Sequence, residues 1–520
     1  MYTRPKIFLP LLLSLCVGAL SVFAFAPFGF WPLQIVTLAI VFHLALRANS
    51  VRHSAMIGWA FGFGWSACGV YWLFISMHRY GGLPSWMAGV AVCLMALTLG
   101  AFAMLALASG SWLQKRLRAP EAVSLLFIFP AFWALSEWLR GWILTGLPWV
   151  ASGYAHTSGP LAGFAPIVGV FGIGWCVAFI AGCIVSSLTR RSDFRISALV
   201  VAVSVLAIGF GLKYIQWTEP NGQPISVRLL QGNVPQEMKF SKAQIESTLV
   251  LYHDMIAAQP ADLIATPETA IPILAQQLPP DYLPRLAGIA EKSKSHLLIG
   301  IPIYDGPKVY TNSVIGLAPS AMAKPAITQY RYDKHHLVPF GEFIPTGFRW
   351  FVEMMQIPLG DFTRGKIVQE PFAVKDQWIL PNICYEDLFG EEIAEQIAAS
   401  QLSGTAQPTI LLNMSNIAWF GDTIALPQHL QISQMRSLET GRPMLRSTNT
   451  GTTAVISHKG EISAQLPPYT RGGLSASVQG YRGATLYTLH GNKTFVAFAL
   501  AMLFVGWILA RKLRRRNYWG

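Results

Sequence analysis

Charged residues are scarce in this sequence. Asp, Glu, Lys and Arg make up 12% of the 520 residues, whereas hydrophobic residues make up 52%. An ordinary soluble domain carries about 25% charged residues. The shortage excludes a chain that is soluble throughout, and it predicts that a large part of the protein lies in lipid. The length is sufficient for two or three domains.

Motifs of several classes of ligand-binding protein are absent as well. The sequence has no Cys/His spacing of a zinc site, no glycine-rich phosphate-binding loop and no RNA-binding signature. The net charge of +13 does not by itself indicate nucleic acid, because an excess of Lys and Arg in a membrane protein marks cytoplasmic loops. We therefore expect no nucleic-acid partner, no metal ion and no cofactor.

Cysteine is rare, and the second half of the chain has a single one. Cys384 is the only cysteine between residues 184 and 520, so no disulfide forms within that half. The other five lie in apolar segments, where cysteine behaves as a small hydrophobic residue; they are Cys16, Cys68, Cys93, Cys176 and Cys183. A lone thiol in a polar region is either part of a core or reactive, and both interpretations stay open at this point.

Long apolar segments are what the sequence has instead. Each is near or above the ~20 residues that cross a bilayer as a helix; the eight segments are 7–25, 30–46, 54–77, 86–113, 123–144, 164–188, 196–213 and 494–510. We therefore predict a multi-span α-helical membrane domain with about eight transmembrane helices. Seven spans lie in residues 1–213, a polar domain occupies 214–493, and the last span with a basic tail occupies 494–520.

Basic residues lie on one side of the predicted membrane. They precede the first segment, occupy alternate loops and follow the last segment in "RKLRRR", whereas the short loops on the other side carry only Arg79. This positive-inside pattern predicts that both termini are cytoplasmic and that the polar domain is outside, which in a bacterium is the periplasm. Cleavage of residues 1–26 as a signal peptide is the alternative for this end, and it would leave the side of the polar domain unchanged.

Two charged residues interrupt the apolar pattern of the spans. Glu137 and Arg140 occur in "ALSEWLRGW", and charges in lipid are usually paired or functional. Their i, i+3 spacing on a helix allows them to pair with each other. We favour that structural interpretation, and a role near a lipid headgroup is the alternative.

The polar domain alternates predicted strands and helices. Short apolar runs such as "ISVRLLQGN" (225–233), "ADLIATPE" (261–268) and "PTILLNMSN" (408–416) read as strands, and "QIESTLVLYHDMIAA" (244–258) has helical spacing. This alternation predicts an α/β domain in which helices cover the faces of the sheets.

Three predicted strands end in residues that can react. Glu268 follows one strand, Lys334 ends "AITQYRYDK", and Cys384 follows "DQWILPNI"; the chemistry of α/β domains lies at such ends. Acyl transfer through a thioester needs these parts, with the carboxylate as base, the ammonium as oxyanion stabiliser and the thiol as nucleophile. Taken singly, each has a structural interpretation as a capping acid, a solvated charge and a core thiol.

These residues stand in motifs that resemble a known superfamily. "TPETA", "YDKHHLVPFGEFIP" and "NICYED" together are similar to the nitrilase (carbon–nitrogen hydrolase) superfamily, whose triad is Glu-Lys-Cys. With the eight spans added, essentially the whole chain resembles the membrane branch of that superfamily, the apolipoprotein N-acyltransferases of the bacterial inner membrane. The resemblance implies a nitrilase-like αββα sandwich for the polar domain.

The resemblance also implies roles for individual residues. The catalytic triad would be Glu268, Lys334 and Cys384, and the supporting residues would be Glu342, Tyr385 and Glu386. The substrate-binding residues would be Trp419 and Phe420 in "SNIAWFG", together with Phe240. Two positions depart from the family pattern: Ile417 stands where an acidic residue is usual, and Phe240 stands where tryptophan is expected.

The implied reaction transfers an acyl chain from a phospholipid to Cys384 and then to the α-amino group of a diacylglyceryl-cysteine on an apolipoprotein. We expect a monomer embedded in the membrane, with residues 347–362 as a lid over the lipid entrance or as a loop packed on the core. A membrane-tethered amide or nitrile hydrolase with the same triad is the alternative function. A transporter or scaffold is a third class, which the intact triad disfavours.

Overall fold

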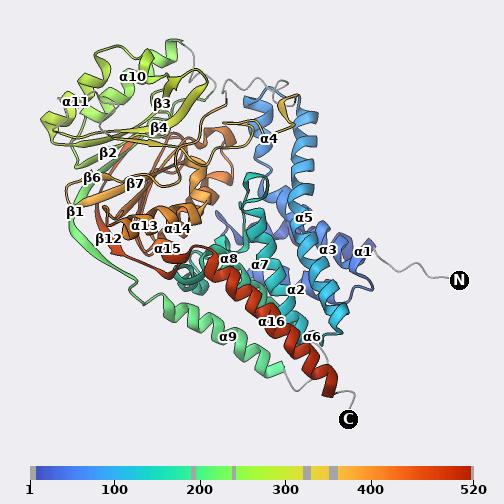
Figure 1. Ribbon diagram of the computed structural model, residues 1–520. Helices are drawn as coiled ribbons and strands as arrows, with labels where there is room; N and C mark the ends of the chain where they lie inside the picture. The colour runs from blue at the N-terminus through green and yellow to red at the C-terminus, as the bar shows by residue number, and fades with distance from the viewer. Residues whose placement is uncertain (1–7, 189–194, 237–241, 320–329, 351–360, 517–520) are drawn as a thin grey trace. The chain divides into compact units, whose positions relative to one another are not determined.

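The computed structural model describes residues 8–188, 195–236, 242–319, 330–350 and 361–516 (Figure 1). The chain divides into two compact units. The first unit comprises residues 1–74, 85–215 and 490–520, and the second comprises 75–84 and 216–489. The short segment 75–84 therefore leaves the helical unit that flanks it and belongs to the second unit.

The first unit is helical. Its main helices are α1 (Phe8–Leu20), α2 (Pro32–Leu46), α3 (Val51–Gly69), α5 (Ser85–Leu117), α6 (Glu121–Val123), α7 (Phe129–Arg140), α8 (Ala165–Leu188), α9 (Arg195–Leu212) and α16 (Lys493–Arg516). Among the described residues, five helical stretches are long and apolar enough to cross a membrane, or six if the pair Val51–Gly69 and Leu73–Tyr80, bent by 61°, counts as one span. The helices Phe8–Ala24 and Pro32–Leu46 are apolar but shorter. Each of the eight predicted segments thus contains a helix, although fewer than eight meet the criteria for a span.

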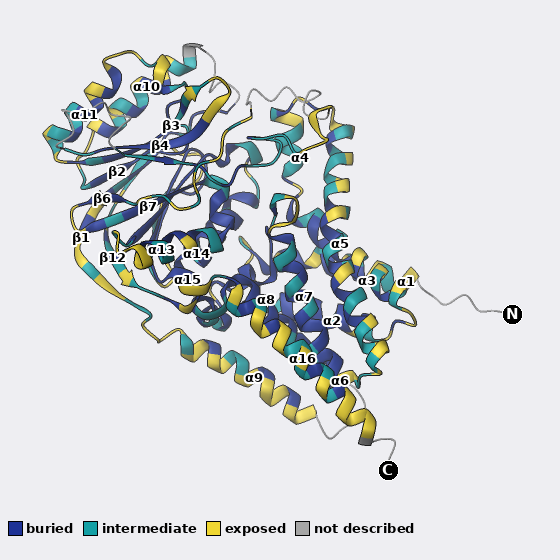
Figure 2. Ribbon diagram, viewed as in Figure 1, coloured by how far each residue is buried: buried dark blue, intermediate teal, exposed yellow. Residues whose placement is uncertain are grey.

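Apolar side chains cover the exposed faces of several of these helices. Figure 2 shows exposed residues along α9 and α16, and on α9 they include Ile196, Val200 and Val203. Such a surface is unfavourable in water and suits the hydrocarbon of a bilayer. The exposure supports a location in the membrane.

Helices α1 and α3 approach each other at glycines. A Cβ atom at Gly18 would lie 2.1 Å from the carbonyl oxygen of Phe61, and one at Gly64 would lie 2.2 Å from that of Leu15. Neither distance leaves room for a side chain, so the two backbones are in direct contact. Small residues at helix interfaces are typical of membrane bundles, because packing rather than water exclusion drives helix association in lipid.

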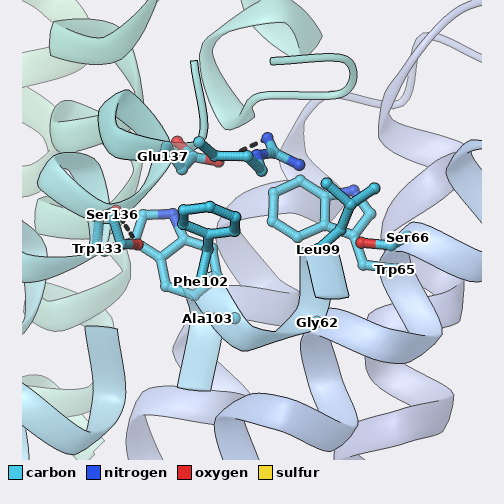
Figure 3. Close-up of a pocket in the computed structure, with 10 residues that line it drawn as sticks. Gly62, Trp65, Ser66, Leu99, Phe102, Ala103, Trp133, Ser136 and Glu137 are labelled. Carbon is cyan, nitrogen blue, oxygen red and sulfur yellow. Dashed lines mark hydrogen bonds and ion pairs between the residues drawn. The ribbon is translucent and has the colours of Figure 1, made fainter. Parts of the chain in front are cut away.

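The charges in α7 pair with each other, as the sequence predicted. Arg140 Nη2 lies 4.0 Å from Glu137 Oε1, and the backbone N–H and hydroxyl of Ser152 donate to the same oxygen at 2.9 and 2.8 Å. Both side chains line a pocket beside the rings of Trp65 and Trp133 (Figure 3). The pair therefore lies inside the helical unit, away from its lipid-facing surface.

The second unit contains two six-stranded sheets among its described residues. In the first sheet the strand order is β12-β1-β2-β3-β4-β5, and in the second it is β11-β10-β9-β8-β7-β6. The strands of the first sheet are β1 (Thr218–Gln231), β2 (Leu263–Ala265), β3 (His296–Gly306), β4 (Val309–Leu317), β5 (Arg331–Asp333) and β12 (Gly472–Gly483). Those of the second are β6 (Phe372–Val374), β7 (Gln377–Ile383), β8 (Ile410–Ser415), β9 (Met444–Thr448), β10 (Ala454–Ile456) and β11 (Ile462–Gln465).

The two sheets pack face to face and helices cover their outer faces (Figure 1). Alternate residues of one strand point to opposite faces, so Leu229 joins the core between the sheets while Leu230 joins the core under the helices. The first sheet is covered by α10 (Lys242–Ala257) and α11 (Tyr282–Ser293), and the second by α13 (Gly390–Ser403) and α14 (Ala425–Thr440). The unit is therefore an αββα sandwich, as the sequence predicted.

Several strands differ from the sequence predictions. In "AITQYRYDK" only Arg331–Asp333 is a strand, and residues 320–329 lie outside the described residues. Strand β12, which pairs with β1, has four glycines or serines among its first six residues, "GGLSAS". Its weak apolar alternation gave no strand signal, although it completes the edge of the first sheet.

Candidate active site

Glu268 lies in the turn after β2, at the end of a buried parallel strand. The following residue, Thr269, has a positive φ of 45°, which turns the chain sharply at this point. The carboxylate of Glu268 is buried and accepts hydrogen bonds from the backbone N–H of Asn416 at 2.8 Å and from Nδ2 of Asn312 at 2.8 Å. These donors fix the carboxylate while leaving it close to Lys334.

Lys334 directly follows β5 and is 1% exposed. Its Nζ lies 3.3 Å from Glu268 Oε1 and 2.9 Å from a carboxylate oxygen of Glu342. Burial alone would lower the pKa of Lys334, but the two carboxylates outweigh it and hold the pKa above its ordinary value. The side chain is therefore a permanent cation between two anions.

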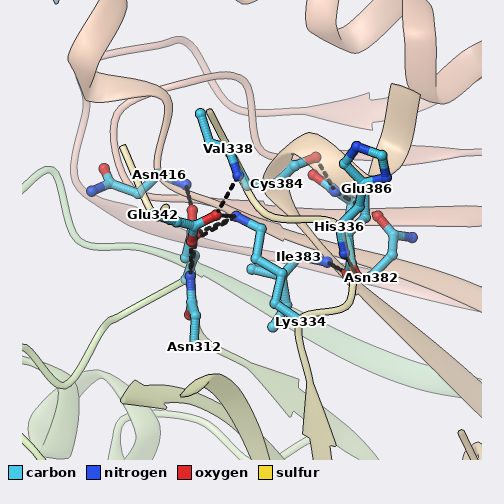
Figure 4. A network of polar contacts seen from close by, with 12 residues as sticks. Asn312, Lys334, His336, Val338, Glu342, Asn382, Ile383, Cys384, Glu386 and Asn416 are labelled. Atoms are coloured by element: carbon cyan, nitrogen blue, oxygen red, sulfur yellow. Dashed lines mark hydrogen bonds and ion pairs between the residues drawn. The ribbon is translucent and has the colours of Figure 1, made fainter. Parts of the chain in front are cut away.

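Both carboxylate oxygens of Glu342 accept hydrogen bonds. It accepts from the backbone N–H of Val338 at 2.8 Å and from Asn312 Nδ2 at 2.8 Å. The amide of Asn312, on β4, thus bridges the two carboxylates that flank Lys334 (Figure 4). This bridge makes Glu268, Lys334 and Glu342 one buried hydrogen-bonded group.

Cys384 begins a 3-10 helix, η11 (Cys384–Leu388), directly after β7. Its φ is +52°, in the left-handed region that a residue with a Cβ rarely adopts. Burial and the charge of Glu268 raise the pKa of the Cys384 thiol to about 12, while Lys334 acts in the opposite direction. The charges of both predicted partners therefore reach the thiol, which is protonated at neutral pH.

Glu386 connects the helical turn that begins at Cys384 to the residues around Lys334 by hydrogen bonds. Its carboxylate accepts from the backbone N–H of Ile383 at 2.6 Å, from that of His335 at 2.7 Å and from the hydroxyl of Tyr332 at 3.0 Å. Burial raises the pKa of Glu386 to about 7, and the backbone donors act against this rise. Glu386 therefore links the residue before Cys384 to the residue after Lys334.

Tyr385 packs among aromatic rings beside this turn. Its ring centroid lies 5.7 Å from that of His336 and 5.2 Å from that of Phe389. His336 Nδ1 is 2.7 Å from Glu392 Oε1. The packing keeps the Tyr385 side chain fixed next to the nucleophile.

Trp419 and Phe420 lie on the 3-10 helix η12 (Ile417–Phe420), which follows β8. Asn416 directly precedes this helix, and its backbone N–H donates a hydrogen bond to the carboxylate of Glu268. Trp419 contacts Tyr80 edge to face at 5.6 Å. Ile417, at the position where the resemblance implied an acidic residue, is 1% exposed and is a core side chain.

Two predictions fall partly or wholly outside the described residues. Phe240 lies in 237–241, and the centre of the predicted lid, 351–360, is likewise outside them. Of the lid's flanks, Trp350 is 62% exposed and Phe348 is 46% exposed. Phe348 contacts Phe340 edge to face at 5.4 Å. The lid therefore stays a prediction.

The sequence did not identify several polar residues that build this site. Asn312, Asn416, Asn413 and His429 all make hydrogen bonds to the triad residues. Asn312 and Asn413 lie on strands whose other residues are mostly apolar. A polar amide in a buried strand requires partners, and this was the available signal.

The arrangement provides the parts for nucleophilic acyl transfer. A buried carboxylate can take the thiol proton, and a permanent cation lies where it can stabilise a tetrahedral oxyanion. Among the described residues, no cluster of three or more His, Cys, Asp or Glu side chains could hold a metal ion.

Comparison with known proteins gives matches to both units. Residues 17–183 match the apolipoprotein N-acyltransferase N-terminal domain, and residues 226–486 match the carbon-nitrogen hydrolase family. An apolipoprotein N-acyltransferase of Ralstonia nicotianae is 48% identical over 96% of this chain and 93% of its own length. One of Nitrosomonas europaea is 39% identical over 98% of this chain and 99% of its own. Among solved structures, a carbon-nitrogen hydrolase from Helicobacter pylori is 17% identical, with a TM-score of 0.36, and covers 56% of this chain and 94% of its own.

Proposed function

Because the chain belongs to the apolipoprotein N-acyltransferase family, we propose that Cys384 carries the acyl group that the enzyme transfers. The protein is an acyltransferase of the bacterial inner membrane, with lipid and lipoprotein substrates. One observation carries the assignment of the site. The Glu268 carboxylate and the Lys334 ammonium form a buried pair whose charges act on the Cys384 thiol, and the three residues follow three different strands.

The first half-reaction forms a thioester. Glu268 accepts the proton of the Cys384 thiol, and the sulfur attacks an ester carbonyl of a phospholipid. Lys334 stabilises the oxyanion of the tetrahedral intermediate. The intermediate then expels the lysophospholipid alkoxide, which takes the proton back from Glu268, and the acyl chain remains on sulfur.

The second half-reaction uses the same groups in reverse. The α-amino group of a diacylglyceryl-cysteine on an apolipoprotein attacks the thioester, and Glu268 accepts a proton from the attacking nitrogen. Lys334 again stabilises the oxyanion. Collapse breaks the C–S bond, the thiolate regains its proton, and the product is an amide on the lipoprotein.

The supporting residues keep these groups in register. Glu342 pairs with Lys334 in addition to Glu268, so the ammonium keeps a partner while Glu268 is protonated. Glu386 holds the backbone before Cys384. Tyr385 contributes its backbone N–H to the oxyanion, and the loop of Trp419 and Phe420 lines the acyl pocket, with Phe240 as a further substrate contact.

The membrane arrangement is also part of the proposal. Eight spans would place both termini in the cytoplasm and residues 214–493 in the periplasm, with 1–213 and 494–520 in or at the membrane. The one-sided distribution of Arg and Lys supports this orientation. We propose that the enzyme acts as a monomer, because eight spans would restrict the packing of copies against one another.

A membrane-tethered hydrolase would use the same triad with water as the acceptor. The relatives match along both units, including the helical one, and this favours the acyltransferase. A hydrolase would need no more than one span as a tether. The two functions differ in the fate of the acyl-enzyme, which hydrolysis would discharge without an amine.

The test is to incubate the purified protein with phospholipid and to search by mass spectrometry for an acyl adduct on the peptide that contains Cys384. We expect the adduct to form and to disappear when a diacylglyceryl peptide is added, with N-acylated peptide as the product. Cys384→Ala should abolish both steps, and Cys93→Ala, at an exposed cysteine of the helical unit, should preserve them. Full activity of Cys384→Ala would overturn the proposal, and ammonia release from simple amides without an adduct would indicate the hydrolase.

A further inference from the structure

Two side chains donate hydrogen bonds to the backbone carbonyl of Cys384. Asn413 Nδ2, on β8, lies 3.2 Å from this oxygen, and His429 Nε2, on α14, lies 3.3 Å from it. Both side chains are buried. Both hydrogen bonds act on the peptide that joins Cys384 to Tyr385.

Arg446 determines which nitrogen of His429 carries the hydrogen. Its Nη2 lies 2.9 Å from His429 Nδ1, and a guanidinium can only donate. Nδ1 must therefore accept, which leaves the hydrogen on Nε2 facing the Cys384 carbonyl. Burial and the charge of Arg446 hold the pKa of His429 well below its ordinary value, so the ring stays neutral.

Arg446 is in turn fixed by the nucleophile's own helical turn. Its Nη1 lies 3.2 Å from Asp387 Oδ2, and the two side chains are 1% and 0% exposed. Nη1 also donates to the carbonyl of His429 at 3.3 Å and contacts the hydroxyl of Ser433. The network starts at Asp387, three residues after the nucleophile, and returns to the carbonyl of Cys384.

The backbone before Cys384 is held as well, because Glu386 accepts from the N–H of Ile383 at 2.6 Å. Cys384 therefore has fixed hydrogen bonds on both sides of its positive φ. A residue with a Cβ atom is strained in the left-handed region and persists there only where its surroundings determine it. The contacts of Glu386, Asn413 and His429 provide such surroundings.

We propose that Asn413, His429 and Arg446 are positioning residues for the oxyanion site. In a trans peptide the C=O and the N–H point in opposite directions, and the Cys384–Tyr385 peptide is trans. Fixing the Cys384 carbonyl toward His429 therefore fixes the Tyr385 N–H toward the opposite side, where the acyl oxygen develops its charge. This inference rests on the proposed function, and it assigns a role to residues that do not touch the substrate.

The test compares two reactions of Cys384 in the full-length protein in detergent. Acylation by phospholipid passes through an oxyanion, whereas alkylation by iodoacetamide does not. Both are followed by mass spectrometry of the peptide that contains Cys384. We expect His429→Ala to slow acylation by about 10- to 100-fold, because loss of one oxyanion donor has an effect of about 10²–10³. Alkylation should stay within about twofold of wild type, as expected when the nucleophile is unchanged.

His429→Gln is the matched variant, because its side-chain amide can donate to the Cys384 carbonyl while its oxygen accepts from Arg446. We expect it to recover most of the acylation rate. Equal loss of acylation and alkylation in His429→Ala would overturn the inference, as would failure of His429→Gln to recover while its thermal midpoint matches wild type. Absence of an acyl adduct in the wild type would instead overturn the proposed function.

Discussion

The thiol of Cys384 is not a preformed nucleophile. Burial and Glu268 raise its pKa to about 12, so thiolate forms at neutral pH only when a base takes the proton. Glu268 has two opposite effects here. As a charge it disfavours the thiolate, and as the proposed base it would accept the proton when the substrate is in place. A substitution can separate these effects.

We predict that Glu268→Gln makes Cys384 react faster with iodoacetamide while phospholipid acylation falls by about 10²–10⁴. Removing the negative charge lowers the pKa of the thiol, so more thiolate is present at each pH from 7 to 9. In both proteins the alkylation rate should rise about tenfold per pH unit, because the pH is below the pKa. The measurement is peptide-resolved mass spectrometry at a series of pH values.

The control for this prediction is Glu246→Gln, at an exposed carboxylate on α10. It should leave both rates unchanged. An alkylation rate in Glu268→Gln that is lower than in wild type would contradict the electrostatic argument. A rate in wild type that is independent of pH from 6 upward would show that the thiolate is already formed at rest.

The positions of Glu268 and Cys384 at strand ends were predictable because their motifs are local. "TPETA" and "NICYED" each place a reactive residue at a strand end, and the structure finds both there. The amide donors were not predictable, because Asn312 is 44 residues and Asn416 is 148 residues from the carboxylate they share. Residues so far apart in sequence come together only when the two sheets pack, and a local sequence pattern contains no information on that packing.

At the scale of elements, residues 75–84 are the least expected part of the fold. The sequence assigned residues 54–77 to one membrane span, but the helix bends by 61° after Gly69. The segment after the bend includes a π-helix, Ser76–Tyr80, and packs with η12 of the second unit. The apolar pattern continues across the bend, so hydropathy alone did not reveal it.

We predict that Tyr80→Ala raises the apparent KM for phospholipid by about two- to tenfold. The edge-to-face contact with Trp419 holds the ring that lines the proposed acyl pocket, and such contacts contribute about 0.5–1.5 kcal/mol. Tyr80→Phe keeps the ring and should retain the wild-type KM. The measurement is the rate of acyl-adduct formation as phospholipid concentration varies in mixed micelles.

Iodoacetamide alkylation of Cys384 should be equal in wild type, Tyr80→Ala and Tyr80→Phe, because the contact lies at the substrate loop rather than at the thiol. If the KM of Tyr80→Ala equalled that of wild type, residues 75–84 would not contribute to the proposed acyl pocket. An equal loss in Tyr80→Phe would assign the effect to the hydroxyl group instead of the ring.

At the scale of the whole molecule, the pairing of strands that are distant in sequence could not be predicted from the sequence. Apolar length located the helices, and alternation located most central strands. Strand β12, however, pairs with β1 from Thr218↔Gly483 to Gln231↔Gly472. These partners lie at opposite ends of the second unit in sequence, and the glycine-rich half of β12 carries little apolar signal.

The orientation in the membrane is testable with single cysteines in a background that lacks the native ones. Leu402 is 90% exposed in the second unit, and Lys512 is exposed near the C-terminus. We predict that a membrane-impermeant maleimide labels Leu402→Cys in intact cells but labels Lys512→Cys only after the inner membrane is opened. Labelling is read by gel shift.

Labelling of both positions in denatured protein provides the control for reactivity. If Lys512→Cys were labelled in intact cells, the C-terminus would be outside and the positive-inside argument would be wrong for the last span. If neither position were labelled in intact cells, the second unit would face the cytoplasm, and the lipoprotein substrate would have to be reached from that side.

The hydrogen-bonded group around Lys334 also has a consequence for how charge moves during turnover. At rest, one ammonium and two carboxylates give the buried group a net charge of minus one. In the proposed intermediate Glu268 is neutral and the substrate oxygen carries the negative charge, so the total is the same. Charge is relocated by a few ångströms rather than created, and no counterion has to enter or leave. The buried group can therefore carry out ionic chemistry without exchanging ions with water.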